Sequence, residues 1–499
     1  RANEMKHILA LDLGTTNVRA VLFDEAMRPV STDEMEISVF YPKSGWVEQD
    51  PVEMITKQLQ VAKRVVDKSG VAEASIAGIG VTNQRETTIL WNRDTGRPIG
   101  NAIVWQDRRT ATICEKVSKT GHAQLIYNST GLILDPYFSA SKINWLMRNT
   151  PGLQEAAKAG KIAFGTVDSW LIWNLTQGKV HYTDPTNASR TMLFNIKTLT
   201  WDDELLNIWD VPREILPTVK PSTGFFGETS LISSKNIPIS GVMGDQQAAF
   251  FGQRCFQRGS TKCTYGTGCF TLINTGDEAN TTSSGLLTTI AFSDGISTEY
   301  ALEASIFMGG STVQWLRDGL GIINRAEEIE ELAEKVEDAN GVVLVPAFTG
   351  LGAPHWDPHA RGIIIGLTRD TNKNHIARSV LDAIAWQVND VIDLMSETAE
   401  IEIDFIRVDG GAVENNLLMQ IQADYLQRPV YRSAHKETTA LGAAMVSSLG
   451  IKLHKSKQEI PVIASEPKIF KPKITQAMKE SAQSTWYRAV KRSLSWAID

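Results

Sequence analysis

Two short hairpins rich in glycine and threonine constrain this chain more than any other feature of its sequence. The first spans residues 7–24, with a bend at Asp12–Asn17, and the second spans residues 260–275, with a bend at Gly266–Gly268. In both, apolar and β-branched segments flank a bend of small residues, which predicts strand, tight turn and strand. Because one hairpin opens each half of the chain, the sequence predicts two related halves.

The residues at these bends are suited to binding phosphate. Glycine lets backbone N–H groups approach an anion closely, and threonine hydroxyls add donors. Asp12 would repel a bare phosphate, so its position makes sense mainly if a cation lies between the two, but this stretch taken alone favours an ordinary hairpin. Two facing hairpins could hold the phosphates of one nucleotide from both sides. This arrangement resembles the duplicated fold of actin, hexokinase and Hsp70.

The rest of the chain fits that fold class. Its 499 residues are 42% hydrophobic and 21% charged, which is an ordinary globular composition with room for at least two domains. Predicted strands alternate with predicted helices throughout, so the class is α/β. We therefore expect two actin/hexokinase-like (RNase H-like) domains that flank a nucleotide cleft, an N-terminal one over residues 1–252 and a C-terminal one over residues 253–499.

Composition excludes several classes of function. The net charge is -7 and no basic patch with interleaved aromatics occurs, so no nucleic-acid partner is expected. No apolar run approaches the roughly 18 residues of a membrane span. The four cysteines form no C-x-x-C pair, which indicates a reducing compartment, and we expect a cytoplasmic protein. Neither a P-loop motif nor G-x-G-x-x-G is present.

Charged residues follow two predicted buried strands. Arg85 and Glu86 come after the strand 76–82, where ligands of α/β proteins gather, although a plain surface salt bridge is an alternative. Asp245 follows the strand 237–244 and opens a small-residue helix. Phosphoryl transfer needs shielded phosphates, an acceptor held in line and a base. Asp245 is the candidate base, with helix capping as a simultaneous role, and Asp12 is the candidate for the metal.

Three aromatic residues could pack on a short carbon chain: Trp105, Tyr137 and Phe270. Each of them alone is more often a core residue. Elsewhere the pattern predicts an extended segment at 36–41, a strand at 101–106, a helix beginning near Ala248, an outer helix at 326–338 and a terminal helix near 486–496.

Longer motifs identify a family. Residues 137–146 read YFSASKINWL and match the first signature of the FGGY carbohydrate-kinase family, whose second signature matches residues 362–382. The stretches GWVE, NQRETT, NASRT, GDQQ and TYGTGCF, which begin at residues 45, 83, 187, 244 and 264, are similar to those of the glycerol kinases of this family. From about Ile8 to Leu449 the chain resembles these kinases.

The resemblance implies ATP-dependent phosphorylation of glycerol to sn-glycerol 3-phosphate. It implies that glycerol is bound by Arg85, Glu86, Trp105, Tyr137, Asp245, Gln246 and Phe270. It implies that ATP is bound by Thr15, Thr16, Asn17, Arg19, Thr267, Gly310, Gln314, Gly411 and Asn415. Asp245 would be the general base, and Asp12 and Asp245 would lie on the Mg²⁺ side. A homodimer or homotetramer is expected.

Three departures from the family pattern stand out. Leu13 occupies a position where glycerol kinases usually carry glutamine, and Asp107 is an unusual acid beside the acceptor site. The loop 228–237 lacks both the Gly-Gly-x-Arg of enzymes inhibited by fructose 1,6-bisphosphate and the histidine of those activated by phosphorylation. Neither kind of regulation is therefore expected.

Two other functions share part of this pattern. An actin- or Hsp70-like ATPase that switches a partner would have the two hairpins but would not need an acceptor pocket or a base. A kinase for a larger ketose or polyol would share the whole architecture, and the aromatic trio argues against it by favouring a small acceptor. Glycerol-dependent release of ADP would distinguish a glycerol kinase from the switch ATPase. A panel of acceptors would distinguish it from a kinase for a larger ketose or polyol.

Overall fold

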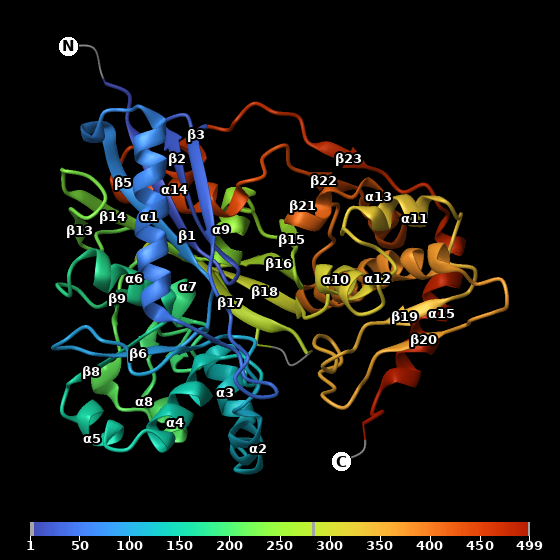
Figure 1. The fold of residues 1–499 in the computed structure, drawn as a ribbon, viewed down its shortest axis with the longest axis horizontal. Coiled ribbons are helices and arrows are strands. Elements are labelled where there is room, and N and C mark those ends of the chain that lie inside the picture. The colour runs from blue at the N-terminus through green and yellow to red at the C-terminus, as the bar shows by residue number, and fades with distance from the viewer. Residues whose placement is uncertain (1–3, 282–284, 498–499) are drawn as a thin grey trace.

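The computed structural model describes residues 4–281 and 285–497, and two mixed β-sheets dominate it (Figure 1). The first sheet has the strand order β13-β14-β5-β1-β2-β3. Its strands are β1 (His7–Leu13), β2 (Asn17–Asp24), β3 (Pro29–Glu36), β5 (Ile76–Asn83), β13 (Glu228–Thr229) and β14 (Ile237–Gly244). Strand β1 is antiparallel to β2 and parallel to β5. The first predicted hairpin is thus at the centre of this sheet.

The second sheet has the order β17-β18-β16-β15-β21-β22-β23. Its strands are β15 (Thr261–Tyr265), β16 (Cys269–Gly276), β17 (Leu287–Ser293), β18 (Thr298–Ile306), β21 (Ile406–Asp409), β22 (Val430–Arg432) and β23 (Lys468–Phe470). Strand β15 is antiparallel to β16 and parallel to β21. The second hairpin therefore has the same place in its sheet as the first, and the predicted two α/β halves are confirmed.

Helices cover both sheets and fill the lower left of Figure 1. The helices of the first half are α1 (Pro51–Ser69), α2 (Ala111–Lys119), α3 (Ala123–Thr130), α4 (Ser139–Asn149), α5 (Leu153–Lys158), α6 (Val167–Leu175), α7 (Pro185–Ala188), α8 (Asp203–Trp209) and α9 (Asp245–Gly252). Those of the second half are α10 (Gly310–Asp318), α11 (Glu328–Glu334), α12 (Lys373–Ala399), α13 (Asn416–Leu426), α14 (Thr438–Gly450) and α15 (Gln476–Ser493).

The remaining strands are short and pair outside the two large sheets. They are β4 (Glu48–Gln49), β6 (Ile89–Asn92), β7 (Ala102–Ile103), β8 (Ile162–Gly165), β9 (Tyr182–Thr183), β10 (Phe194–Asn195), β11 (Thr200–Trp201), β12 (Thr218–Val219), β19 (Val343–Val345) and β20 (Ile363–Ile365). Most lie in the long insertion between β5 and β14, which forms a hydrophobic core of its own with α4 and α8.

One late helix packs on the first sheet. The α14 ribbon lies among the blue strands of Figure 1 and contacts β14, β5, β1 and helix α9. Small residues permit this close approach, since a Cβ added at Gly442 would lie 1.8 Å from the Ala248 carbonyl oxygen. The small-residue composition that the sequence shows at 439–449 is therefore explained by a helix crossing.

Several predicted bounds are wrong. Strand 101–106 shrinks to Ala102–Ile103, because the short strand β4 offers it only two partner residues. The extended segment expected at 36–41 forms only an isolated bridge, between Phe40 and Glu48, and no strand. Helix α9 begins at Asp245 rather than near Ala248. The helix expected at 326–338 is only α11, and the terminal helix α15 ends before the exposed Trp496, whose side chain supplies no buried face.

The helices that the structure describes between residues 4–281 and 285–497 include none that is both long and apolar enough to cross a membrane. The sequence expectation of no membrane-spanning helix agrees with this finding.

Candidate active site

The carboxyl ends of two parallel strands bring the predicted charged residues together. Strand β14 lies beside β5, with Gly244 opposite Asn83, so Arg85 and Asp245 follow neighbouring strand ends. Arg85 Nε lies 3.5 Å from Asp245 Oδ1. Glu86 has a left-handed backbone with φ of 64°, which is uncommon for a non-glycine residue and typical of functional sites. The structure therefore places all three residues in one cluster.

The three predicted aromatic residues also meet. The Trp105 ring contacts Tyr137 and Phe270 edge-on, at centroid distances of 5.8 and 6.0 Å. Arg85 Nη2 donates a long hydrogen bond of 3.5 Å to the Tyr137 hydroxyl. A mainly apolar cavity of about 300 Å³ is lined by Trp105, Tyr137, Phe307 and Met308, among other residues. Two of the three aromatic residues, Trp105 and Tyr137, thus line a space that suits a small polyol, and the charged cluster adjoins it through the contact between Arg85 and Tyr137.

A second cavity, of about 560 Å³, collects the predicted nucleotide residues of the second half. Its lining includes all five of them: Thr267, Gly310, Gln314, Gly411 and Asn415. A Cβ added at Gly411 would meet no atom within 4 Å, so space is open there. Thr267 borders this cavity and the 300 Å³ cavity as well. The two cavities therefore meet at the bend of the second hairpin.

The first hairpin faces the aromatic trio rather than the 560 Å³ cavity. Trp105 Nε1 donates to Thr15 Oγ1 at 2.9 Å, and the turn is closed by a bond from Gly14 N to the Asn17 carbonyl. Thr16 accepts a backbone bond from Ile37 through its carbonyl, which leaves its hydroxyl out of the ladder.

Arg19, the last predicted nucleotide residue of this hairpin, is held by two acids. Its guanidinium pairs with Glu34 at 2.7 Å and with Glu437, at the start of α14, at 2.9 Å. The structure thus gives Arg19 a contact between the two halves, in addition to the role that the sequence predicts.

Two carboxylates influence each other at the predicted metal position. Burial, and then the charge of Asp245, raises the pKa of Asp12 to about 7. Burial likewise raises the pKa of Asp245, against the opposing effect of Arg85. A pair of hard oxygen ligands beside a phosphate site fits Mg²⁺, which binds one or two carboxylates plus phosphate and water. Among the described residues, no group of three or more potential metal-binding side chains occurs.

Sequence reasoning missed two buried charges, Arg190 and Glu303. Glu303 Oε1 lies 2.7 Å from Arg85 Nη1, and Arg190 Nε donates to Glu86 Oε2 at 2.7 Å. An acid within the apolar run Tyr300–Ile306 of strand β18 was a usable signal for Glu303, because acids are almost never fully buried unless paired. Arg190 lies in a motif that the sequence singled out without giving it a role.

The predicted substrate residue Gln246 faces the second hairpin. Its Oε1 accepts a hydrogen bond of 2.7 Å from Lys262 Nζ, on β15. The two sequence departures are structural: Leu13 is fully buried in the core, and the Asp107 carboxylate accepts bonds from Val47 N and Arg109. Asp107 therefore stabilises the loop around the acceptor site.

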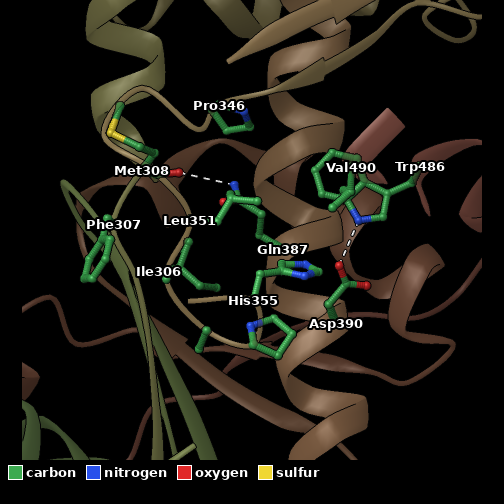
Figure 2. A pocket seen from close by; sticks show the side chains of 14 residues that line it. Ile306, Phe307, Met308, Pro346, Leu351, His355, Gln387, Asp390, Trp486 and Val490 are labelled. Atoms are coloured by element: carbon green, nitrogen blue, oxygen red, sulfur yellow. Dashed lines mark hydrogen bonds between the residues drawn. The ribbon is translucent and has the colours of Figure 1, made fainter. Parts of the chain in front are cut away.

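A small cavity of about 20 Å³ lies between α12, α15 and the loop before Met308 (Figure 2). Gln387 Nε2 donates to the Met308 carbonyl at 3.3 Å, and Trp486 Nε1 donates to Asp390 Oδ2 at 2.8 Å. Burial raises the pKa of Asp390 to about 7. None of the predicted site residues lines this cavity, which has room for about one water molecule.

Comparison with known proteins agrees with this geometry. The N-terminal domain of the FGGY family of carbohydrate kinases matches residues 7–252, and its C-terminal domain matches residues 261–450. The chain belongs to the FGGY family of carbohydrate kinases. It is 52% identical to glycerol kinase 2 of Thermotoga maritima over 493 residues, which cover 99% of each chain.

Two further relatives are glycerol kinases. Glycerol kinase 1 of Clostridium tetani is 51% identical over 98% of this chain and 99% of its own. The crystal structure of Plasmodium falciparum glycerol kinase with ADP is similar with a TM-score of 0.89 and 37% identity, over 98% of this chain and 99% of that one. Membership of the family, which the sequence motifs predict, is thus confirmed.

Proposed function

We propose that this protein transfers the γ-phosphoryl group of ATP to glycerol and forms sn-glycerol 3-phosphate and ADP. The observation that carries the proposal is the shared border of the two cavities, since Thr267 lines both the space beside Trp105 and Tyr137 and the space beside Gly411. An acceptor in the first cavity would lie next to the terminal phosphate of a nucleotide in the second. The glycerol kinases among its relatives support this choice of acceptor.

Each acceptor residue has a distinct role in this proposal. Arg85 donates to one glycerol hydroxyl and Glu86 accepts from its neighbour, while Trp105 and Phe270 pack on the carbon chain. Asp245 accepts the proton of the attacking primary hydroxyl as the bond to phosphorus forms. The raised pKa of Asp245, caused by burial, brings this carboxyl closer to the value that suits a base near neutral pH.

The nucleotide side rests on the two hairpins. The first hairpin contributes donors to the phosphates from Thr15, Thr16, Asn17 and Arg19, and the second hairpin contributes Thr267. The nucleoside is bordered by Gly310, Gln314, Gly411 and Asn415. Asp12 and Asp245 would hold Mg²⁺, which would neutralise charge on the transferred phosphoryl group. The same proposal assigns the glycerol site and the catalytic Asp245 to residues 1–252, and most of the nucleotide site to residues 253–499.

The alternatives are less well supported. A nucleotide-driven switch explains the 560 Å³ cavity but has no use for a second cavity at Trp105 and Tyr137 with Arg85 beside it. A kinase for larger sugars would have to fit its substrate between Trp105 and its two edge-on partners, which lie within about 6 Å of that ring.

An acceptor panel in a coupled ADP assay tests the proposal. Glycerol, 1,2-propanediol and a ketopentose are compared at saturating Mg·ATP, with an assay without acceptor as the control. Loss of one hydroxyl removes one hydrogen-bond partner from a polar atom of Arg85 or Glu86, so kcat/KM for 1,2-propanediol is expected to be at least about 100-fold lower. Equal rates for the two alcohols would contradict the acceptor site, and ADP release independent of any acceptor would favour a switch ATPase.

A cytoplasmic location and a homodimer or homotetramer complete the proposal. All four cysteines are buried and free, which agrees with a reducing compartment. Light scattering of the purified chain tests the assembly: a mass of two or four chains is expected, and a monomer would contradict it.

A further inference from the structure

Four buried charges form a closed ring behind the acceptor site. Glu303 Oε1 lies 2.7 Å from Arg85 Nη1, and Glu303 Oε2 lies 2.6 Å from Arg190 Nη2. Arg190 Nε lies 2.7 Å from Glu86 Oε2, which in turn lies 3.8 Å from Arg85 Nε. All four residues are at most 3% exposed. Two cations and two anions thus alternate around the ring and balance in charge.

The ring joins segments that are far apart in the sequence. Arg85 and Glu86 follow β5 of the first sheet, and Arg190 follows α7 in the insertion. Glu303 lies on β18 of the second sheet, opposite Leu272 on β16 and Leu287 on β17. Arg85 is therefore held directly by a carboxylate from the second half, and Glu86 is linked to that carboxylate through Arg190.

The two carboxylates of the ring differ in the direction of their pKa shifts. Burial alone would raise the pKa of Glu303, yet Arg190 and Arg85 keep it below its usual range. For Glu86 the effect of burial exceeds that of the same two arginines, and its pKa is raised. The distances explain the difference, because Glu303 has both arginines within 2.7 Å and Glu86 has one of them at 3.8 Å.

Arg190 contacts the aromatic side of the acceptor site as well. Its guanidinium carbon lies 5.5 Å from the Tyr137 ring centroid and 5.3 Å from that of Phe138. The segment before it is anchored by Asp184, which accepts bonds from the backbone N–H groups of Thr186 and Asn187 and from the Ser222 hydroxyl. These hydrogen bonds therefore fix the backbone segment that leads to Arg190.

We propose that Arg190 and Glu303 are positioning residues for the acceptor. They hold the Arg85 guanidinium and the strained Glu86 segment in the orientation in which Arg85 and Glu86 bind two neighbouring hydroxyls of glycerol. This inference rests on the proposed glycerol kinase activity and adds two residues that act through Arg85 and Glu86. A planar guanidinium fork between two carboxylates fixes direction as well as charge, which a flexible ammonium does not.

Glu303→Gln tests the role of the ring, with Glu299→Gln as the matched control. Glu299 lies on the same strand and pairs with Lys457 at 2.7 Å, away from the ring. In Glu303→Gln we expect KM for glycerol to rise at least about tenfold and the preference for glycerol over 1,2-propanediol to narrow by a similar factor. ADP affinity, measured by calorimetry, is expected to stay within about twofold in both variants, and Glu299→Gln is expected to keep the preference.

If Glu303 only stabilised the fold, Glu303→Gln would not change the ratio of kcat/KM for glycerol to kcat/KM for 1,2-propanediol. This ratio therefore distinguishes a positioning role from a structural one. A folded Glu303→Gln enzyme with glycerol KM and preference within threefold of the wild type would overturn the inference. Because removing one partner of a buried ion pair is costly, Arg190→Lys provides a second test that keeps the charge. A smaller preference of Arg190→Lys for glycerol over 1,2-propanediol would support the inference, and an unchanged preference would contradict it. Wild-type activity on glycerol tests the proposed function separately.

Discussion

Trp105 Nε1 donates a hydrogen bond of 2.9 Å to the hydroxyl of Thr15. An aromatic residue of the proposed acceptor pocket is thereby tied to the hairpin that is proposed to contact phosphate. The indole ring also lies edge-on to Phe270, which follows the bend of the second hairpin. Acceptor and nucleotide sites are thus connected through one ring.

Thr15→Val tests this connection, because valine keeps the shape and removes the hydroxyl. A hydrogen bond of this kind is worth about 1 kcal/mol, so we expect KM for glycerol to rise about fivefold, with a comparable rise for ATP. Thr16→Val is the matched control and should affect ATP alone, since Thr16 bonds through its backbone carbonyl. Equal glycerol KM in the two variants would show that the bond has no role in acceptor binding.

The crossing of α9 and α14 predicts a large effect of one methyl group. A Cβ at Gly442 would lie 1.8 Å from the backbone oxygen of Ala248, which cannot move without separating the two helices. Overpacking of this kind costs about 1–3 kcal/mol or more, so Gly442→Ala should lower Tm by several degrees in calorimetry. Gly224→Ala is the control, because its nearest atom would be 3.6 Å away. Equal Tm values for both variants would contradict the tight crossing.

Asp390 predicts a pH dependence of stability. Burial raises its folded pKa to about 7 from the ordinary 3.8, so the unfolded chain ionises first as pH rises. Its contribution therefore destabilises the fold progressively between about pH 4 and pH 7, by roughly 2–4 kcal/mol in total, and is constant above pH 7.

Asp390→Asn removes this titration and keeps an oxygen that can accept from Trp486 (Figure 2). We expect the Tm of the variant, relative to wild type, to increase between pH 5 and pH 7 and to level off above. Asp404→Asn, at an exposed position before β21, is the control. A Tm difference that is independent of pH would show that Asp390 is already ionised at pH 5.

The sequence predicted the parts of the site that depend on local pattern. Turn residues and apolar periodicity correctly placed the Gly266–Gly268 bend and the strand before Asp245. These features are encoded within a few neighbouring residues, so a single sequence is sufficient to reveal them.

Long-range pairing was not predictable in the same way. The ring partner Glu303 is 218 residues from Arg85, and nothing in the intervening pattern specifies that these two charges meet. Likewise, the crossing of α14 with the first sheet depends on packing between segments of different halves. The short strand at Ala102–Ile103 was overestimated because its length is set by its partner β4 and not by its own residues.

The central claim is that Asp245 removes the proton of the attacking hydroxyl. Asp245→Asn keeps the shape and an oxygen that can accept from Gln246 N, at 2.8 Å in the wild type, but cannot take up the proton. Asp202→Asn makes the same substitution at the N-cap of α8 and is the control for the change from carboxylate to amide.

The decisive measurement is kcat of Asp245→Asn with glycerol and ATP, together with glycerol affinity by calorimetry. A positioned general base is worth about 10²–10⁴-fold, and a loose transition state places the effect at the lower end of that range. We expect kcat to fall at least about 100-fold while glycerol still binds, and we expect Asp202→Asn to leave kcat unchanged. A kcat within threefold of the wild type would contradict it and would place the base elsewhere.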